Sequence, residues 1–249
     1  MKAITHTTIA AMRRHPNFAA AKAGDGAAAV ALVRDLTDAR KVRALAAAHP
    51  GAILVPVLAV ERTGVNAIPL AYVKYAAHIT GLAVEMGILQ TNRTHHTDAG
   101  AIHRLLARPE FDGAPRPGAR YIVADDVITT GSTVQALRLF LERWGGEVVA
   151  FTALAGSFSP LSGSSLQVTI TEDTRHAIEA KFGFAAFARL LRELAVADAP
   201  AELTNSQARY LLAFGSLDAI RNRLASPAGR YHLEGHRQGP QAQLTLALA

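Results

Sequence analysis

The segment Tyr121–Thr133 constrains the fold more than any other part of the chain. Four residues of strand character, Tyr121–Ala124, run into two adjacent acids, Asp125 and Asp126. A short loop containing Gly131 follows, and the apolar spacing beyond it predicts a helix. A buried strand that turns tightly into a helix is a unit of an α/β sheet. The helix N-terminus offers unpaired backbone N–H groups and a partial positive charge, which favour a bound phosphate.

The side chains of this segment suit a phosphorylated sugar. Gly131 allows close approach of the backbone, and four hydroxyl groups add donors: Thr129, Thr130, Ser132 and Thr133. Asp125 and Asp126 do not favour a phosphate, so they should face sugar hydroxyls or a hydrated divalent cation. The alternative is an N-capped helix after a strand, with both acids solvated. The complete strand–acid–acid–loop–helix pattern is more specific than a lone glycine pattern.

All thirteen positions of Tyr121–Thr133 resemble the 5-phosphoribosyl-1-pyrophosphate (PRPP) motif of the type I phosphoribosyltransferases. The resemblance implies that Asp125 and Asp126 contact the ribose 2′ and 3′ hydroxyls and are the catalytic acids, with Asp126 as an assisting base. It implies Mg²⁺ as cofactor, with the same two acids as its ligands. It also implies a loop that holds the 5′-phosphate, made of Val127, Ile128, Thr129, Thr130, Gly131, Ser132 and Thr133.

Strands and helices alternate on both sides of the motif. Ala52–Val60 has the length and composition of a buried parallel strand, Ala67–Ile79 predicts a helix, and Glu147–Ala155 predicts another strand. This order predicts a parallel α/β sheet with right-handed crossovers. With the resemblance, we expect a Rossmann-like phosphoribosyltransferase core with helical extensions: a helical N-terminal segment at 1–50, the core at 51–156 and a mainly helical C-terminal extension at 157–249.

A second turn, Glu61–Asn66, follows the strand at Ala52–Val60. Ligands of such sheets lie beyond the carboxyl ends of the strands, so this turn and the motif loop are predicted to face one cleft. Type I phosphoribosyltransferases place their pyrophosphate loop here, which implies substrate binding by Arg62, Thr63 and Gly64. Backbone N–H groups and a guanidinium fork suit a diphosphate. The alternative is an ordinary turn with a solvated arginine.

The polar segment 90–118 matches the position of the family's flexible lid. Arg93 is predicted to close over the diphosphate, since lids exclude water and complete a site; a solvated loop is the alternative. His95 and His96 do not predict a metal site, because adjacent histidines rarely share a face.

The run Val55-Pro56-Val57, followed by Arg62, Gly64 and Asn66, resembles the ComF-like, competence-associated branch of the same superfamily. The spacing of the arginine, glycine and asparagine departs from the usual run of that branch, and its cysteine-containing N-terminal module is absent. The specific part of the resemblance is therefore the PRPP motif.

Charge and composition limit the kinds of partner that the protein could bind. Lys and Arg number 26 against 20 Asp and Glu, a formal charge of +6, which suits an anionic small substrate and equally nucleic acid. No dense Lys/Arg block is present, which weakens the nucleic-acid alternative, and the helix pair expected at 206–224 lacks a basic face and favours a packed hairpin over a DNA-binding one. Without cysteine, disulfides and thiolate metal sites are excluded. No apolar run reaches the roughly 18 residues of a membrane span, and no signal peptide is evident, so we expect a cytoplasmic protein without a membrane partner.

The resulting functional hypothesis is a phosphoribosyltransferase. It would bind PRPP with Mg²⁺ and transfer 5-phosphoribose to a nitrogen nucleophile, nucleobase-like but unidentified, with release of diphosphate. The resemblance also implies a homodimer. The alternative is a non-catalytic PRPP-fold regulatory or ComF-like protein linked to DNA uptake or processing.

Overall fold

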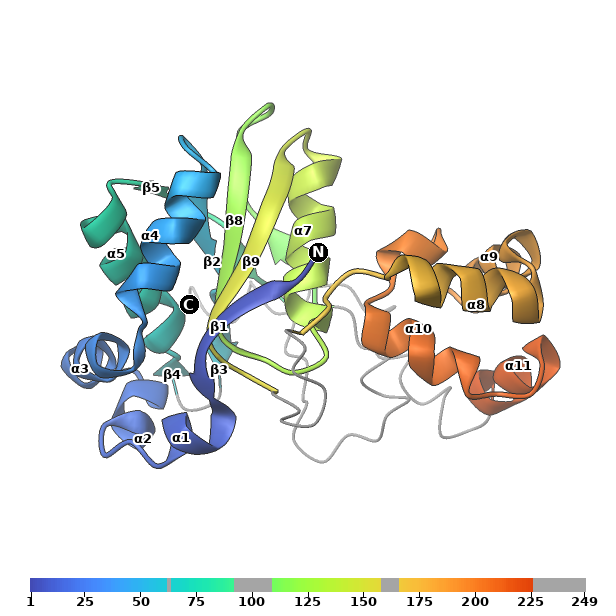
Figure 1. Ribbon diagram of the computed structural model, residues 1–249, viewed down its shortest axis with the longest axis horizontal. Helices are drawn as coiled ribbons and strands as arrows, with labels where there is room; N and C mark the ends of the chain where they lie inside the picture. The colour runs from blue at the N-terminus through green and yellow to red at the C-terminus, as the bar shows by residue number, and fades with distance from the viewer. Residues whose placement is uncertain (62–63, 92–108, 158–165, 226–249) are drawn as a thin grey trace, which may run out of the picture.

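Five parallel strands form the central sheet, in the order β1-β9-β8-β2-β5. The computed structural model describes residues 1–61, 64–91, 109–157 and 166–225 (Figure 1). The predicted parallel α/β fold class is confirmed. The strands are β1 (Ala3–Thr8), β2 (Ile53–Pro56), β5 (Ala83–Val84), β8 (Arg120–Ile128) and β9 (Glu147–Gly156). Two antiparallel hairpins stand apart from the sheet: β3 (Val60–Glu61) with β4 (Gly64–Val65), and β6 (Leu89–Gln90) with β7 (Phe111–Asp112).

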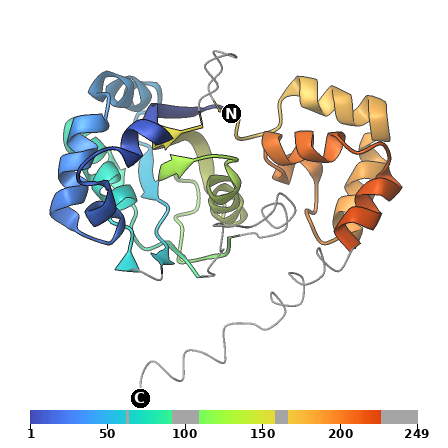
Figure 2. The same cartoon turned by 90° about the horizontal axis from the view of Figure 1, so that it is seen from below.

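Helices cover both faces of the sheet (Figure 2). One face carries α1 (Ile9–Arg13), α2 (Phe18–Lys22), α3 (Gly26–Leu36), α4 (Ala39–Ala48) and α5 (Ile68–Thr80), and the other carries α7 (Ser132–Arg143). Because side chains alternate along a strand, β8 supplies both cores. Ile122 and Ala124 pack into the α5 side, whereas Tyr121 and Val123 pack into the α7 side. This alternation decides where the two acids that follow them point.

The N-terminal segment departs from the expectation of a purely helical region. Helices occupy most of residues 1–50, but Ala3–Thr8 forms β1 and pairs with β9, with Ala3 opposite Phe151 and Ile4 opposite Thr152. The segment Ala-Ile-Thr-His-Thr-Thr is rich in β-branched residues, which favour strands. It also closes the edge of β9, whose backbone groups would otherwise lack a partner on that side. The N-terminus is therefore part of the sheet.

The segment after α5 adds only a short edge strand to the sheet. Only Ala83–Val84 joins the sheet, as β5, and the chain then leaves it to form β6 at Leu89–Gln90. None of the helices in the described part of the chain is long and apolar enough to cross a bilayer.

The C-terminal residues form a helical lobe with its own core. The lobe consists of α8 (Glu172–Phe182), α9 (Phe184–Glu193), the short 3₁₀ helix η1 (Pro200–Glu202), α10 (Asn205–Leu212) and α11 (Leu217–Ala225), and Figure 1 shows it beside α7. Its apolar cluster includes Phe187, Leu191 and Ile220, all fully buried. Helices at 206–213 and 217–224 were predicted and are found. The domain boundaries at 50 and 156 remain a prediction.

Candidate functional site

Strand β8 continues through both acids. We expected it to end at Ala124, but the ladder with β9 runs on, with Asp125 opposite Ala153 and Ile128 opposite Gly156. Both carboxylates are buried, each residue keeping 7% of its surface exposed. The alternation of β8 directs Asp125 toward the α7 side and Asp126 toward the α5 side. The two acids thus occupy different surroundings although they are adjacent in sequence.

Asp126 is held by three donors. Its Oδ2 accepts hydrogen bonds from Asn66 Nδ2 at 2.7 Å and from Lys22 Nζ at 3.1 Å, and its Oδ1 accepts from the backbone N–H of Val127 at 2.7 Å. Asn66 is itself fixed, because its Oδ1 accepts from the backbone N–H of Ile68 at the start of α5 at 3.1 Å. The Asp126 carboxylate therefore sits in a preorganised, charge-assisted network.

The two acids differ in protonation. Burial raises the pKa of Asp125 well above its usual value, and the neighbouring charge of Asp126 raises it further. Burial acts on Asp126 in the same direction, but the charge of Lys22 and the hydrogen bonds from Asn66 and Lys22 outweigh it and lower the pKa of Asp126. Asp126 is the ionised member of the pair, and Asp125 is the member that takes up a proton more readily.

The loop after β8 forms a small hollow at the start of α7. Gly131 is the residue before the helix, with φ of +80°, and no side chain caps the first-turn N–H groups. The Thr130 and Ser132 hydroxyls lie 3.3 Å apart. A cavity of about 30 Å³ lies here, lined by Asp125, Val127, Ile128, Thr129, Gly131, Ser132, Thr133 and Val134. An uncapped helix N-terminus surrounded by hydroxyl groups suits a phosphate.

Most of the predicted motif residues therefore meet at one cavity, but Asp126 and Thr130 are not among its lining residues. Gly64 lies in the β3–β4 hairpin opposite Glu61. Arg62, Thr63 and Arg93 lie outside the described residues. The predicted meeting of the two turns is supported by the bond between Asn66, directly after the hairpin, and Asp126 on β8.

Lys22 is the site residue that sequence reasoning missed. It lies 104 positions from Asp126, at the end of an alanine-rich helix, and no local pattern connects the two. Asn66 was noticed as part of the turn, but its contact with Asp126 was not foreseen.

Asp125 and Asp126 are the candidate ligands for Mg²⁺. Among the described residues, no group of three or more histidine, aspartate or glutamate side chains gathers to form a complete metal cage. Mg²⁺ usually takes one or two carboxylates and completes its shell with waters and ligand phosphates. Asp125 lines the cavity and could serve such a cation, whereas Asp126 already accepts hydrogen bonds from Lys22, Asn66 and Val127.

No family model matches the chain. Among curated proteins, it is similar to Protein TraN of Escherichia coli, 34% identical over 234 residues, which cover 90% of this chain and 49% of that protein. It is 31% identical over 71 residues to the transcriptional regulator GfcR of Methanocella arvoryzae (28% of this chain, 34% of that protein). It is 41% identical over 71 residues to an adenine phosphoribosyltransferase of Burkholderia lata (26% of this chain, 38% of that protein). The chain spans half or less of the length of these relatives.

Among solved structures, an adenine phosphoribosyltransferase of Rhodothermus marinus aligns with a TM-score of 0.32 and 21% identity, covering 50% of this chain and 67% of that one. A purine phosphoribosyltransferase of Pyrococcus horikoshii aligns with a TM-score of 0.31 and 14% identity, covering 63% and 90%.

Proposed function

We propose that the protein binds PRPP and transfers its 5-phosphoribosyl group to a nitrogen nucleophile, with release of diphosphate. The observation that carries the proposal is the single cavity in which Asp125 meets the motif loop at the uncapped start of α7. The thirteen-residue PRPP motif supports it. The 71-residue similarity to an adenine phosphoribosyltransferase also supports it.

The described residues suit two parts of the ligand. The first-turn N–H groups of α7 and the hydroxyls of Thr129, Ser132 and Thr133 would hold the 5′-phosphate. Asp125, which lines the same cavity, would accept a hydrogen bond from a ribose hydroxyl. Arg62, Thr63, Gly64 and Arg93 remain predicted partners of the diphosphate.

In the transfer, the nucleophile forms a bond to C1 of the ribose while the bond from C1 to the diphosphate oxygen breaks, and the diphosphate leaves with the electron pair. Catalysis would come mainly from positioning and from stabilising the developing charges. Bound Mg²⁺ would neutralise charge on the diphosphate. The nucleophile must also lose a proton. One of the two motif acids would accept that proton.

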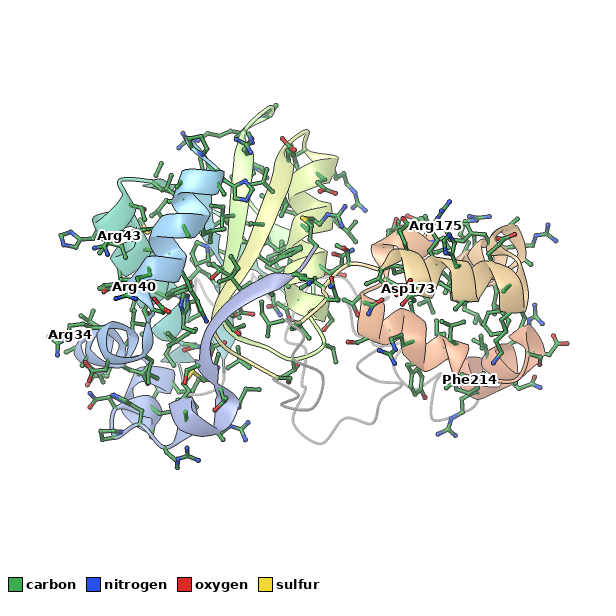
Figure 3. The ribbon with its side chains drawn as sticks, in the orientation of Figure 1. Arg34, Arg40, Arg43, Asp173, Arg175 and Phe214 are labelled. Atoms are coloured by element: carbon green, nitrogen blue, oxygen red, sulfur yellow. The ribbon has the colours of Figure 1, made fainter. Side chains whose placement is uncertain are left out.

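Calorimetric titration with PRPP and Mg²⁺ tests the binding step, and a diphosphate-release screen over free bases tests the transfer. Asp125→Asn should abolish or strongly weaken PRPP binding. The matched control is Asp173→Asn, because Asp173 is an exposed acid on α8 of the helical lobe (Figure 3). Wild-type affinity in the Asp125→Asn variant would overturn the site assignment.

A second candidate function is a PRPP-binding regulatory protein without transferase activity. The similarity to a transcriptional regulator favours it. The two functions separate in one experiment, since a regulator would bind PRPP but release no diphosphate with any base. The ComF-like resemblance remains a prediction of the sequence.

A further inference from the structure

We infer that Lys22 is a positioning residue of the proposed PRPP site: its ammonium group holds and neutralises Asp126, so that Asp125 is the acid left to meet the ligand. This inference rests on the proposed function. The motif alone assigns ligand contact to both acids. The inference gives ligand contact to Asp125 and an ion pair with Lys22 to Asp126.

The first step is the direction of the two side chains. Asp125 lines the cavity at the start of α7, and Asp126 does not. Asp126 instead follows Ile122 and Ala124 toward the α5 side of the sheet, where Lys22 and Asn66 reach it. The two carboxylates still interact with each other, but Asp125 lines the cavity whereas Asp126 binds Lys22 and Asn66.

The second step is the number of donors on each carboxylate. Asp126 accepts on both oxygens, from Lys22 and Asn66 on Oδ2 and from Val127 N–H on Oδ1. A ribose hydroxyl that approached Asp126 would compete with an ammonium group, which is a stronger donor to a carboxylate than a neutral hydroxyl is. Asp125 accepts a backbone hydrogen bond from Asp126 N–H at 2.8 Å and interacts with the Asp126 side chain, but it has no ammonium group bonded to it. Asp125 is thus the acid with capacity for a ligand.

The third step is electrostatic. Two buried carboxylates beside a phosphate site oppose the binding of a polyanion, and their effect is strong because burial reduces screening. The Asp126 side chain is only 10% exposed, and the Lys22 side chain is 35% exposed. The ion pair between them neutralises the charge of Asp126, which would otherwise repel the ligand.

The fourth step is the rigidity of the Lys22 support. Ala21, its neighbour in α2, is fully buried, and its carbonyl accepts a hydrogen bond from the backbone N–H of Ala67 at 3.3 Å. Ala67 directly follows Asn66. The two donors to Asp126 Oδ2 therefore come from segments that are bonded to each other.

The test compares Lys22→Met with Lys22→Arg, with Lys74→Met as the matched control, because Lys74 is an exposed lysine on α5. In calorimetric titrations with PRPP and Mg²⁺, we expect Lys22→Met to weaken binding about tenfold or more, as expected for the loss of a nearby compensating charge. Lys22→Arg should largely restore the affinity, and Lys74→Met should match wild type. With Mn²⁺ alone, Lys22→Met should bind tighter than wild type, because a positive charge next to a cation site has been removed.

In Lys22→Met, PRPP affinity should fall while Mn²⁺ affinity rises. This pattern distinguishes an effect of the Lys22 charge from a loss of structural support. Unchanged PRPP affinity in Lys22→Met would overturn the inference while leaving the proposed function standing. Parallel loss of PRPP and Mn²⁺ binding would also overturn it, because it would indicate a damaged site. Failure of the wild-type protein to bind PRPP would overturn the proposed function and the inference with it.

Lys22→Met leaves a buried carboxylate without its ion-pair partner and can fail to fold for that reason. The double variant Lys22→Met/Asp126→Asn, compared with Asp126→Asn alone, covers that case. We expect Lys22→Met to cost little PRPP affinity in the Asp126→Asn background, because the charge that Lys22 neutralises is gone. An equal cost in both backgrounds would contradict a role through Asp126.

Discussion

The amide of Asn66 donates a 2.7 Å hydrogen bond to the Asp126 carboxylate, across 60 positions of the chain. This bond connects the turn after β2 to strand β8. Its two residues are buried, each less than a tenth exposed. It therefore joins the turn that is predicted to bind diphosphate to the strand whose acids are predicted to bind ribose.

Asn66→Ala should destabilise the protein. Removing a hydrogen bond to a buried charged group costs about 1.5–3 kcal/mol, and here the substitution also frees the Ile68 N–H. Urea denaturation of the variant measures this loss. Asn17→Ala is the control, since the Asn17 side chain makes no cap hydrogen bond. Equal stability of the two variants would show that the Asn66–Asp126 bond contributes nothing net.

Gly131→Ala should destabilise the loop and weaken PRPP binding. A non-glycine residue at a φ of +80° costs about 1–2 kcal/mol, and the new Cβ would lie 3.2 Å from Val168 Cγ1. Gly81→Ala separates the two causes, because Gly81 has nearly the same backbone angles (φ +75° and ψ 5°, against +80° and 8° at Gly131), but its Cβ would meet nothing within 4 Å. Thermal denaturation should show the larger loss for Gly131→Ala. An equal loss would mean that Val168 moves aside without cost.

Stability should fall in mild acid because of His6. The backbone N–H of Asp38 donates to His6 Nδ1, so Nε2 carries the proton and donates to Tyr72 Oη, which lies 2.6 Å from the Thr152 hydroxyl. Burial and the charge of Lys41 lower the pKa of His6 from 6.5 to about 4, against the opposing charge of Asp38.

The direction of this pH effect on stability follows from proton uptake by His6. Between pH 6.5 and about 4 the unfolded chain binds a proton at His6 that the folded chain does not. The His6 contribution is therefore present above pH 6.5 and is lost as the pH falls toward 4, by up to about 3 kcal/mol. Denaturation at a series of pH values measures this slope, and His6→Gln should flatten it. An unchanged slope in His6→Gln would assign the acid sensitivity to other groups.

The helical lobe should unfold separately from the sheet. Phe187 lies in the apolar cluster of the lobe, and Leu137 lies in the cluster between α7 and the sheet; both are fully buried. Phe187→Ala should lower the free energy of unfolding by about 3–5 kcal/mol, mainly in the helical lobe. Leu137→Ala should lower it by about 2–5 kcal/mol, mainly in the sheet and its helices. Hydrogen exchange followed by mass spectrometry locates the loss. Increased exchange throughout both lobes in either variant would instead indicate one cooperative unit.

Local patterns predicted the parts of the fold that local physics determines. The motif strand, its loop and helix α7 follow from apolar periodicity and from Gly131, and the helices near 206–224 follow from the same spacing. Strand β1 was missed because the threonines and His6 give it no apolar run, although its β-branched residues favour a strand and β9 pairs with it. The Lys22–Asp126 pair depends on how α2 packs, which no short-range pattern encodes.

Strand β1 has a consequence for how the chain folds. Its partner in the sheet is β9, and Ile4 accepts a hydrogen bond from the Thr152 hydroxyl, 148 positions later. During synthesis, β1 leaves the ribosome well before β9 and must therefore wait for its partner. Pairing across so long a separation is slow. Until β9 emerges, we expect the N-terminal residues to lie open to chaperones and proteases.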